Sequence, residues 1–426
     1  MCASKYEDGQ PYDPGRPSFG YKPLKPGQIR LLRLLRSKTN DLSYELIHDN
    51  LDSKKSYSAL SYRWGKAENT HNIKVDGRIF PISKNLHNGL EQLHGHKPNK
   101  KDSDSVYEFL WVDAICINQG TSPAACKERS IQITLMKRIY EQAKTVLVWL
   151  GNPVNETNNR LAFQKMNDIY ARFRQTQKKN RTYRPWWWPH APERTEDDVF
   201  KTMASISADD RSLFDVEGSE THKAWLGILS LWRNPWWTRT WVYQEATIPE
   251  DYTMFYIAGV TVRPIKCKVK FLCGNEMGSW STLARAMTVA DHLQAMPSID
   301  TSFMRGAQEP FRRLLAFRRK RIQNIPQSLL DLLQFFRRTE CQDPRDKVYS
   351  PLCLAPSESQ AFMAPDYLGK STLDVYLEVA KFSLTQPDRQ LDFLGFAVWL
   401  PEVPRHHHQT YLPPLSPHGS RTGSSL

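Results

Sequence analysis

The chain has 426 residues and carries 58 lysines and arginines against 45 aspartates and glutamates, a formal net charge of +13. This length allows two or three domains, and the basic excess keeps nucleic acid or an anionic surface among the partners to consider. No apolar run approaches the ~18–20 residues of a membrane-spanning helix, and the first residues lack the basic and apolar regions of a signal peptide. We therefore expect a soluble, cytoplasmic protein without a transmembrane segment. Seven scattered cysteines without a C-x-x-C pair predict reduced thiols and no metal site.

The N-terminal part is predicted to alternate short strands with turns. Residues 1–27 hold five prolines among polar residues, so we expect a disordered leader there. Strands are expected at 29–35 and 43–47. An Asp76-Gly77 pair lies between two strand-like runs and has the residues that a type I′ hairpin turn requires. Ser83 can then cap a helix whose leucines at 86, 90 and 93 share one face.

Residues 107–151 predict a parallel α/β unit. The run 109–117 is apolar except for Asp113 and suits a strand buried on both faces, and 145–150 is a second strand that ends before Gly151. Between them we expect a helix that buries apolar residues recurring at every fourth position, namely Ile131, Leu135, Ile139 and Ala143. Ligands of such sheets bind where strands end and helices begin. The polar residues around this junction are therefore candidates for a site.

Beyond Gly151 the pattern is mainly helical. We expect helices at 159–174, 223–232 and 328–336, an inserted loop near 175–192, a strand at 252–262, and a further helix with Asp343 as its N-cap. The segment Arg312–Arg321 holds six cations and no acid. We interpret it as the solvated face of a helix that packs Leu314, Leu315 and Phe317 inward; a phosphate-binding face or a nuclear-import signal, which would place the protein in the nucleus, is the alternative. Residues 401–426 are expected to be a disordered tail.

Four strings occur in order along the chain: YSALSYRWG at 57–65, LWVDAICINQ at 110–119, ERSIQITLMKRIYEQAKTVLVWLG at 128–151 and RTWVYQE at 239–245. Together they resemble the successive signatures of the fungal heterokaryon-incompatibility (HET) domain. A fifth string, CQDPRDKVYSPLCLA at 341–355, resembles a motif usually found downstream of that domain. The matched blocks span Tyr57 to about Tyr367, with long unmatched insertions between them.

This resemblance implies an α/β fold with a Toll/interleukin-receptor-like core and a parallel sheet, followed by a mainly α-helical extension. It divides the chain into a leader at 1–27, a HET domain at 28–250 with its core at 57–151, an extension at 251–400 and a tail at 401–426. It also implies a part in fungal non-self recognition, a form of innate immunity, and in the programmed cell death that follows. Protein partners or self-association would carry that role, and nucleic acid is the less favoured partner. A tryptophan-rich segment common in family-like proteins is missing near the tail, so an inactive truncated paralogue is one alternative.

The other alternative is an enzyme that cleaves NAD as its substrate and requires no cofactor. By resemblance to NAD-cleaving members of the Toll/interleukin-receptor-like fold, Glu128, expected at the start of its helix, is the first catalytic candidate. A carboxylate can stabilise the oxocarbenium-like transition state that forms when the nicotinamide glycosidic bond breaks. Complementation of the helix dipole is the structural reading of Glu128, and Glu128→Gln would then cost at most about 1 kcal/mol.

Asp113 is the second catalytic candidate. An unpaired carboxylate within a buried strand costs several kcal/mol, so we expect a partner for it: Arg129, Arg239 or a backbone N–H group. A structural ion pair is favoured over catalysis.

Further polar and aromatic residues are candidates for ligand binding. Asn118 and Gln119 can contact a ribose or base, or cap the turn at Gly120. Trp64 and Gly65 can let a planar ligand approach the backbone, although a core role for Trp64 is the alternative. The RTWVYQE string forms either a ligand wall or, as we favour, a lock between the helical part and the core. The full set of candidates is Tyr62, Trp64, Gly65, Asn118, Gln119, Arg129, Arg239, Trp241 and Glu245.

Overall fold

A mixed β-sheet forms the centre of the protein. The structure, a computed structural model, describes residues 19–35, 42–53, 55–64, 71–95, 108–181, 204–206, 208–209, 216–247, 269–295, 306, 308–322 and 325–386. The described strands are β1 (Gln28–Leu34), β2 (Ser43–Asn50), β3 (Ser58–Tyr62), β4 (His71–Val75), β5 (Arg78–Ile82), β6 (Phe109–Val112), β7 (Thr145–Trp149), β8 (Val269–Cys273) and β9 (Glu276–Ser279). They form one sheet in the order β5-β4-β2-β1-β6-β3-β7-β8-β9.

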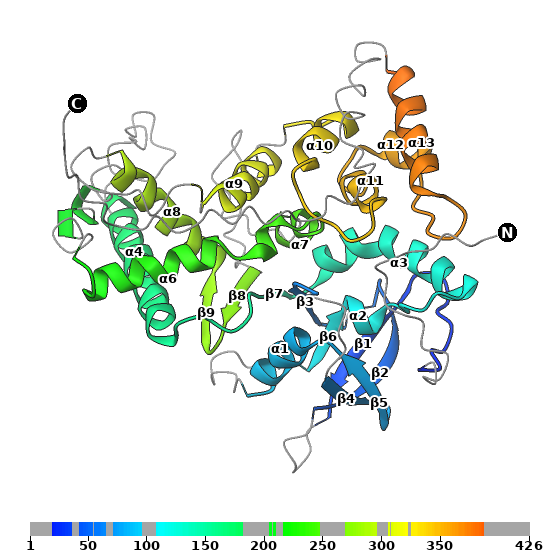
Figure 1. The fold of residues 1–426 in the computed structure, drawn as a ribbon, viewed down its shortest axis with the longest axis horizontal. Helices are drawn as coiled ribbons and strands as arrows, with labels where there is room; N and C mark the ends of the chain where they lie inside the picture. The colour runs from blue at the N-terminus through cyan, green and yellow to red at the C-terminus, as the bar shows by residue number, and fades with distance from the viewer. Residues whose placement is uncertain are drawn as a thin grey trace, which may run out of the picture.

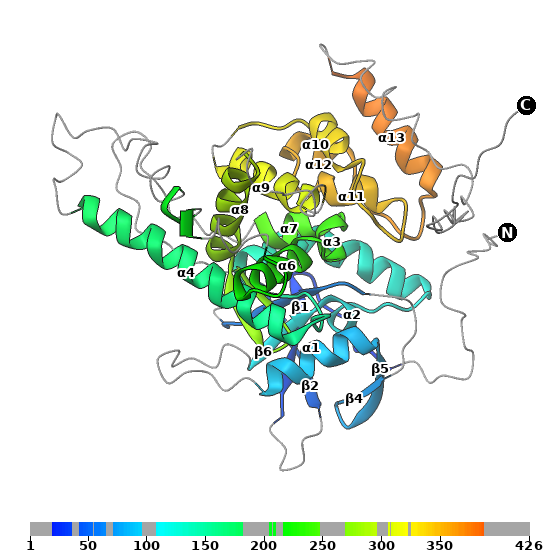
Figure 2. The same ribbon diagram turned by 60° about the vertical axis from the view of Figure 1, so that its left-hand side comes forward.

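The described helices are α1 (Lys84–Gly95), α2 (Asp113–Cys116), α3 (Pro123–Gln142), α4 (Glu156–Arg181), α6 (Glu220–Trp232), the 3-10 turn η1 (Pro235–Thr238), α7 (Val242–Thr247), α8 (Trp280–Gln294), α9 (Glu309–Ile322), α10 (Leu329–Phe336), α11 (Asp346–Leu352), α12 (Ser357–Phe362) and α13 (Thr372–Leu384). Helices cover both faces of the sheet, with α1 on one side and α3 on the other (Figure 1). The helices from α7 to α13 gather on the side of α3 (Figure 2). None of the described helices is long and apolar enough to cross a membrane.

The middle of the sheet is parallel. Strands β6, β3, β7 and β8 are parallel neighbours, and Leu60 of β3 lies opposite Val112 on one side and Leu147 on the other. Every residue of β3 and β7 is buried, as expected of strands covered on both faces. Among these four strands the one that comes first in the chain, β3, lies between the second and the third, which is the order of flavodoxin-like doubly wound folds. The predicted α/β class is confirmed, but the sheet is mixed because most of its outer pairings, such as β1–β2 and β8–β9, are antiparallel.

The short-range predictions near the N-terminus are confirmed. β1 and β2 form where strands were expected. β4 and β5 form a hairpin in which Asp76 and Gly77 have φ angles of 50° and 74°, as a type I′ turn requires. The Ser83 hydroxyl accepts the Leu86 backbone N–H at 3.3 Å at the start of α1. One part of the expected leader differs, because Phe19 and Tyr21 pack edge-on against Phe80 of the sheet; residues 1–18 lie outside the described part of the chain.

Three predictions for 107–151 are wrong in detail. The strand expected at 109–117 ends at Val112, and α2 begins at Asp113, whose carboxylate accepts the Ala114 N–H at 2.7 Å. Helix α3 begins at Pro123, so Glu128 lies in its second turn and not at its start. The expected buried stripe also drifts, since steps of four residues advance about 40° around a helix with 3.6 residues per turn. Ile139 is therefore buried, whereas Ile131 is 48% exposed.

The second half of the chain is mainly helical, with the predicted helices at α4, α6 and α10. Three details differ. α4 continues to Arg181, into the expected loop near 175–192. α11 begins at Asp346 with Arg345 as its N-cap, because Asp343 instead accepts the Arg345 N–H at 2.9 Å before the helix. β8 and β9 extend the central sheet after residue 250, so the extension is not purely helical. The strand expected at 252–262 and the tail at 401–426 lie outside the described residues.

The basic segment Arg312–Arg321 belongs to α9. Leu314 and Phe317 are buried as expected, whereas Leu315 is only partly buried, at the edge of the face that Phe311, Leu314 and Phe317 form. Several of the cations have local partners: Arg312 pairs with Asp291, and Arg313 pairs with Glu309. The segment is therefore mainly the outer face of a packed helix.

Candidate functional site

The candidate site lies at the carboxyl ends of β3 and β6. Tyr62 is the last residue of β3, and Asp113 directly follows β6, so the parallel pairing of these strands places the two residues at the same edge of the sheet. The Trp64 indole N–H donates to Asp113 Oδ2 at 2.8 Å, and the Gln119 side-chain amide donates to the Asp113 carbonyl at 3.1 Å. Trp64 is 36% exposed and Asp113 is half-buried. An indole and a carboxylate thus form an accessible rim, the strand-end cluster, above a buried tyrosine.

A buried ion pair lies behind this rim. Arg239, which follows η1, pairs with Glu245 of α7 at 3.3 Å, and Glu245 is only 1% exposed. The Ser61 hydroxyl donates to Glu245 Oε2 and accepts the Trp236 indole N–H at 2.8 Å. The second Glu245 oxygen, Oε1, accepts from Arg239 Nη2 at 3.5 Å. Both oxygens of the Glu245 carboxylate therefore have partners, as a buried ion pair requires for stability. The network joins β3 to segments about 180 residues later in the chain.

The charges of the site influence one another. Burial raises the pKa of Asp113 to about 6, while Arg239 opposes that rise and Glu245 adds to it. Burial lowers the pKa of Arg239, but the carboxylates of Glu245 and Asp113 hold it above its ordinary value. Burial, followed by the nearby Asp113 carboxylate, raises the pKa of Tyr62 well above its usual range. Asp113 is therefore the group of this site that changes protonation in mildly acidic solution.

Replacing Asp113 by asparagine is expected to flatten the pH dependence of stability. A carboxyl group whose pKa rises on folding stabilises the folded state below its unfolded pKa, and that contribution is lost as pH rises through the folded pKa. The free energy of unfolding of the wild type should therefore fall by about 1–3 kcal/mol more between pH 4 and pH 7 than that of Asp113→Asn, the lower bound allowing for solvent screening. Urea unfolding of both proteins across this range measures the difference. Identical slopes would show that Asp113 titrates as an exposed carboxylate.

Glu128 lies in a different cluster. Arg30, a fully buried residue of β1, holds both carboxylate oxygens of Glu128, with Nη1–Oε1 at 2.6 Å and Nη2–Oε2 at 2.8 Å. Glu128 Oε1 also accepts the Asn118 backbone N–H at 3.0 Å, and Arg30 donates to the Cys116 carbonyl at 3.0 Å. Glu128 thus fixes the α2–α3 turn to β1. The expectation that Glu128 begins its helix and complements the helix dipole is wrong, because its carboxylate is the partner of a buried cation.

The other described candidate residues hold either the turn before α3 or the contact with the extension. Asn118 accepts the Gly120 N–H at 3.0 Å and Arg129 donates to the Gly120 carbonyl at 2.7 Å, so both hold the turn before α3. Trp241 faces the extension and donates to Asp346 at 3.0 Å. Gly65 lies outside the described residues. Among the partners expected for Asp113, the backbone N–H is found and Arg239 acts through its charge, whereas Arg129 binds Gly120 instead.

A polar interface joins the 57–245 region to the extension. Asp346 of α11 accepts both the Trp241 indole N–H and the Tyr367 hydroxyl. The Gln244 side-chain amide donates to the Ser350 carbonyl at 2.8 Å. The contacts agree with the interpretation of RTWVYQE as a lock. Asp346, Ser61 and Trp236 were not among the predicted site residues, although each lies within or beside a string that the sequence singled out.

Comparison with known proteins places these residues in a family. Residues 57–245 match the model of the family described as heterokaryon incompatibility protein (HET). The chain is also 37% identical over 138 residues to heterokaryon incompatibility protein 6, OR allele, of Neurospora crassa, a match that covers 30% of this chain and 20% of that protein. The chain thus aligns with about a fifth of the length of this curated relative. No solved structure matches the chain significantly. The matched range begins at Tyr57, just before β3, and ends at Glu245, which accepts a hydrogen bond from Ser61 of that strand, so residues 57–245 are the part of this chain that is of the HET type.

Proposed function

We propose that this chain acts in heterokaryon incompatibility, as a cytoplasmic module that recognises non-self and promotes programmed cell death through protein partners or self-association. The observation that carries the proposal is the strand-end cluster, in which the exposed Trp64 ring is fixed by Asp113 over the buried Arg239–Glu245 pair. An aromatic rim on a rigid base suits protein recognition, since aromatic residues supply large contact areas at a low entropy cost. The match to an incompatibility protein supports the same role.

The finer proposal concerns the fold of the core. The order β6-β3-β7-β8 supports a relationship to doubly wound signalling domains, and we propose a Toll/interleukin-receptor-like core on this basis. In such sheets the order reverses at one strand, here β3, and ligands bind outside its carboxyl end. Trp64 lies two residues after that end. The strand-end cluster thus occupies the position where this class of fold binds its ligands.

NAD cleavage is a second candidate function. The position of Asp113 suits a catalytic carboxylate better than the position of Glu128 does. Both oxygens of Glu128 are held by Arg30, whereas Asp113 lies at the accessible rim beside an indole on which a planar base can stack. In this reaction the bond between the nicotinamide nitrogen and ribose C1′ breaks, and water adds to C1′. The Asp113 carboxylate would stabilise the positive charge that develops on the ribose.

Induced expression in Neurospora crassa tests the two candidates together. The wild-type chain is expected to arrest hyphal growth and to increase the fraction of cells stained by a vital dye, while cellular NAD stays at the level of the empty-vector strain. Growth arrest preceded by NAD loss, together with nicotinamide release by the purified protein, would favour the enzyme. Normal growth at confirmed protein levels would contradict the proposed role and favour the inactive paralogue.

A further inference from the structure

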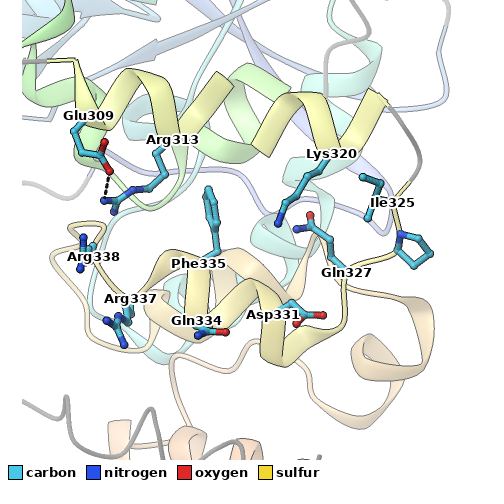
Figure 3. A pocket seen from close by; sticks show the side chains of 11 residues that line it. Glu309, Arg313, Lys320, Ile325, Gln327, Asp331, Gln334, Phe335, Arg337 and Arg338 are labelled. Atoms are coloured by element: carbon cyan, nitrogen blue, oxygen red, sulfur yellow. Dashed lines mark hydrogen bonds and ion pairs between the residues drawn. The ribbon is translucent and has the colours of Figure 1, made fainter. Parts of the chain in front are cut away.

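A cationic cleft lies between α9 and α10, away from the strand-end cluster. Its volume is about 610 Å³, within the range of roughly 300–1,000 Å³ typical of small-molecule sites. Figure 3 shows the side chains of Arg313 and Lys320 directed from α9 into the space between the two helices, where they face Phe335 of α10. Arg337 and Arg338 line one end of the same space. Nothing in the family match covers this region, which begins more than 60 residues after residue 245.

The two carboxylates that line the cleft are already engaged. Glu309 pairs with Arg313 one turn along α9, at 3.1 Å. The Asp331 carboxylate accepts both the backbone N–H and the hydroxyl of Ser328, at 3.0 and 2.7 Å, and so completes the capping box of α10. The cleft is therefore lined by four cations and two acids, and Arg313 shares its charge with Glu309. Lys320 and Arg338 are exposed and have no ion-pair partner among the described residues.

The wall of the cleft is rigid and aromatic. Phe335 packs against Phe317, with ring centroids 5.2 Å apart, and against Tyr243 of α7 at 5.5 Å. Phe317 and Phe336 pack beneath it and are buried. A side chain held in this way does not need to be ordered when a ligand binds, which lowers the entropic cost of binding.

We propose that this cleft binds a small molecule that carries several phosphate groups. Arg313 and Lys320 are seven residues apart on α9, so they lie on one face about 10 Å apart along the axis. Arg337 and Arg338 add charge at the end of the opposite wall. Cations with this separation suit several phosphates better than one, and arginine binds phosphate oxygens in pairs. A cleft of about 610 Å³ accommodates a molecule the size of a nucleotide or an inositol phosphate.

Isothermal titration of the full chain with inositol hexakisphosphate, ATP and pyrophosphate tests this proposal. The test variant is Lys320→Ala with Arg338→Ala. Its control is Lys84→Ala with Arg160→Ala, which removes two exposed cations from α1 and α4 and gives the same net charge. At fixed ionic strength the wild type should bind at least one probe at a single saturable site. The Kd should rise at least about tenfold in the test variant, because two cations that can form charge-assisted hydrogen bonds to phosphate are removed, and about twofold or less in the control.

Three results would overturn the proposal: no saturable binding of any probe, an equal loss of affinity in both double variants, or tighter binding of a polyglutamate peptide than of every phosphate probe. Equal loss would mean that the probes respond to the overall charge of +13 and not to the cleft. Because all four substituted side chains are exposed, both variants should melt within a few degrees of the wild type in the absence of probe.

Discussion

Replacing Glu245 by alanine is expected to lower the free energy of unfolding by about 3–5 kcal/mol. The substitution leaves the Arg239 guanidinium without its carboxylate, in a position where only 15% of its side chain is exposed. It also removes the acceptor of the Ser61 hydroxyl, which holds the Trp236 indole. An uncompensated charge and a broken hydrogen-bond network add to the volume lost at a buried position.

Urea unfolding at pH 7, followed by circular dichroism, measures the effect of Glu245→Ala. The matched control is Glu217→Ala, which removes an exposed carboxylate from a turn and should change stability by about 0.5 kcal/mol or less. A loss below about 1 kcal/mol for Glu245→Ala would mean that Arg239 finds water or another acceptor, and that the network does not hold β3 and α7 together.

Glu128→Gln is expected to cost about 2–4 kcal/mol, more than the limit of about 1 kcal/mol that a dipole role implies. Glutamine retains one acceptor oxygen but places an amide N–H₂ group against the buried Arg30 guanidinium, where the structure has a bidentate pair. Urea unfolding of the wild type and of Glu128→Gln at one temperature and pH measures this loss.

A double-mutant cycle isolates this pair. Arg30→Gln should also be strongly destabilising, since it leaves the Glu128 carboxylate without its cation and removes the donor to the Cys116 carbonyl. The double variant should be more stable than the sum of the single losses predicts, by at least about 1 kcal/mol, because two neutral amides can bond to each other. Additive losses would show that the two side chains do not interact. Any decrease in NAD cleavage by Glu128→Gln has to be compared with this loss of folded protein.

Elements governed by neighbouring residues could be predicted from the sequence. The Asp76-Gly77 hairpin and the Ser83 cap depend on backbone preferences within four residues, and both form as expected. The end of β6 could not be read in the same way, because the apolar run 109–117 suits either a strand or a buried helix. The break at Val112 arises when Asp113 turns to bond with Ala114 and Trp64. Phe19 and Tyr21 likewise gain their packing from a strand about 60 residues away.

The composition of the candidate site was only partly predictable for the same reason. The strings that contain Tyr62, Trp64, Asp113, Arg239 and Glu245 indicated that these residues matter, and the fold brings them together. The pairing of Glu128 with Arg30 joins residues 98 positions apart, and an arginine in a strand that also holds Arg33 gives no local sign of its partner. The link from Trp241 to Asp346 spans 105 positions. Such pairs are set by tertiary packing.

The central claim is that the exposed strand-end rim carries the proposed incompatibility function. The most direct test compares hyphal growth in Neurospora crassa strains induced to express the wild type or Trp64→Ala. Trp64 is exposed enough that its loss should cost about 1 kcal/mol of stability, so the variant should accumulate as folded protein. Leu373→Ala, a truncation at a site that is 61% exposed on α13, is the control and should arrest growth like the wild type. We expect folded Trp64→Ala to restore normal growth; full growth arrest by that variant at wild-type protein levels would contradict the claim.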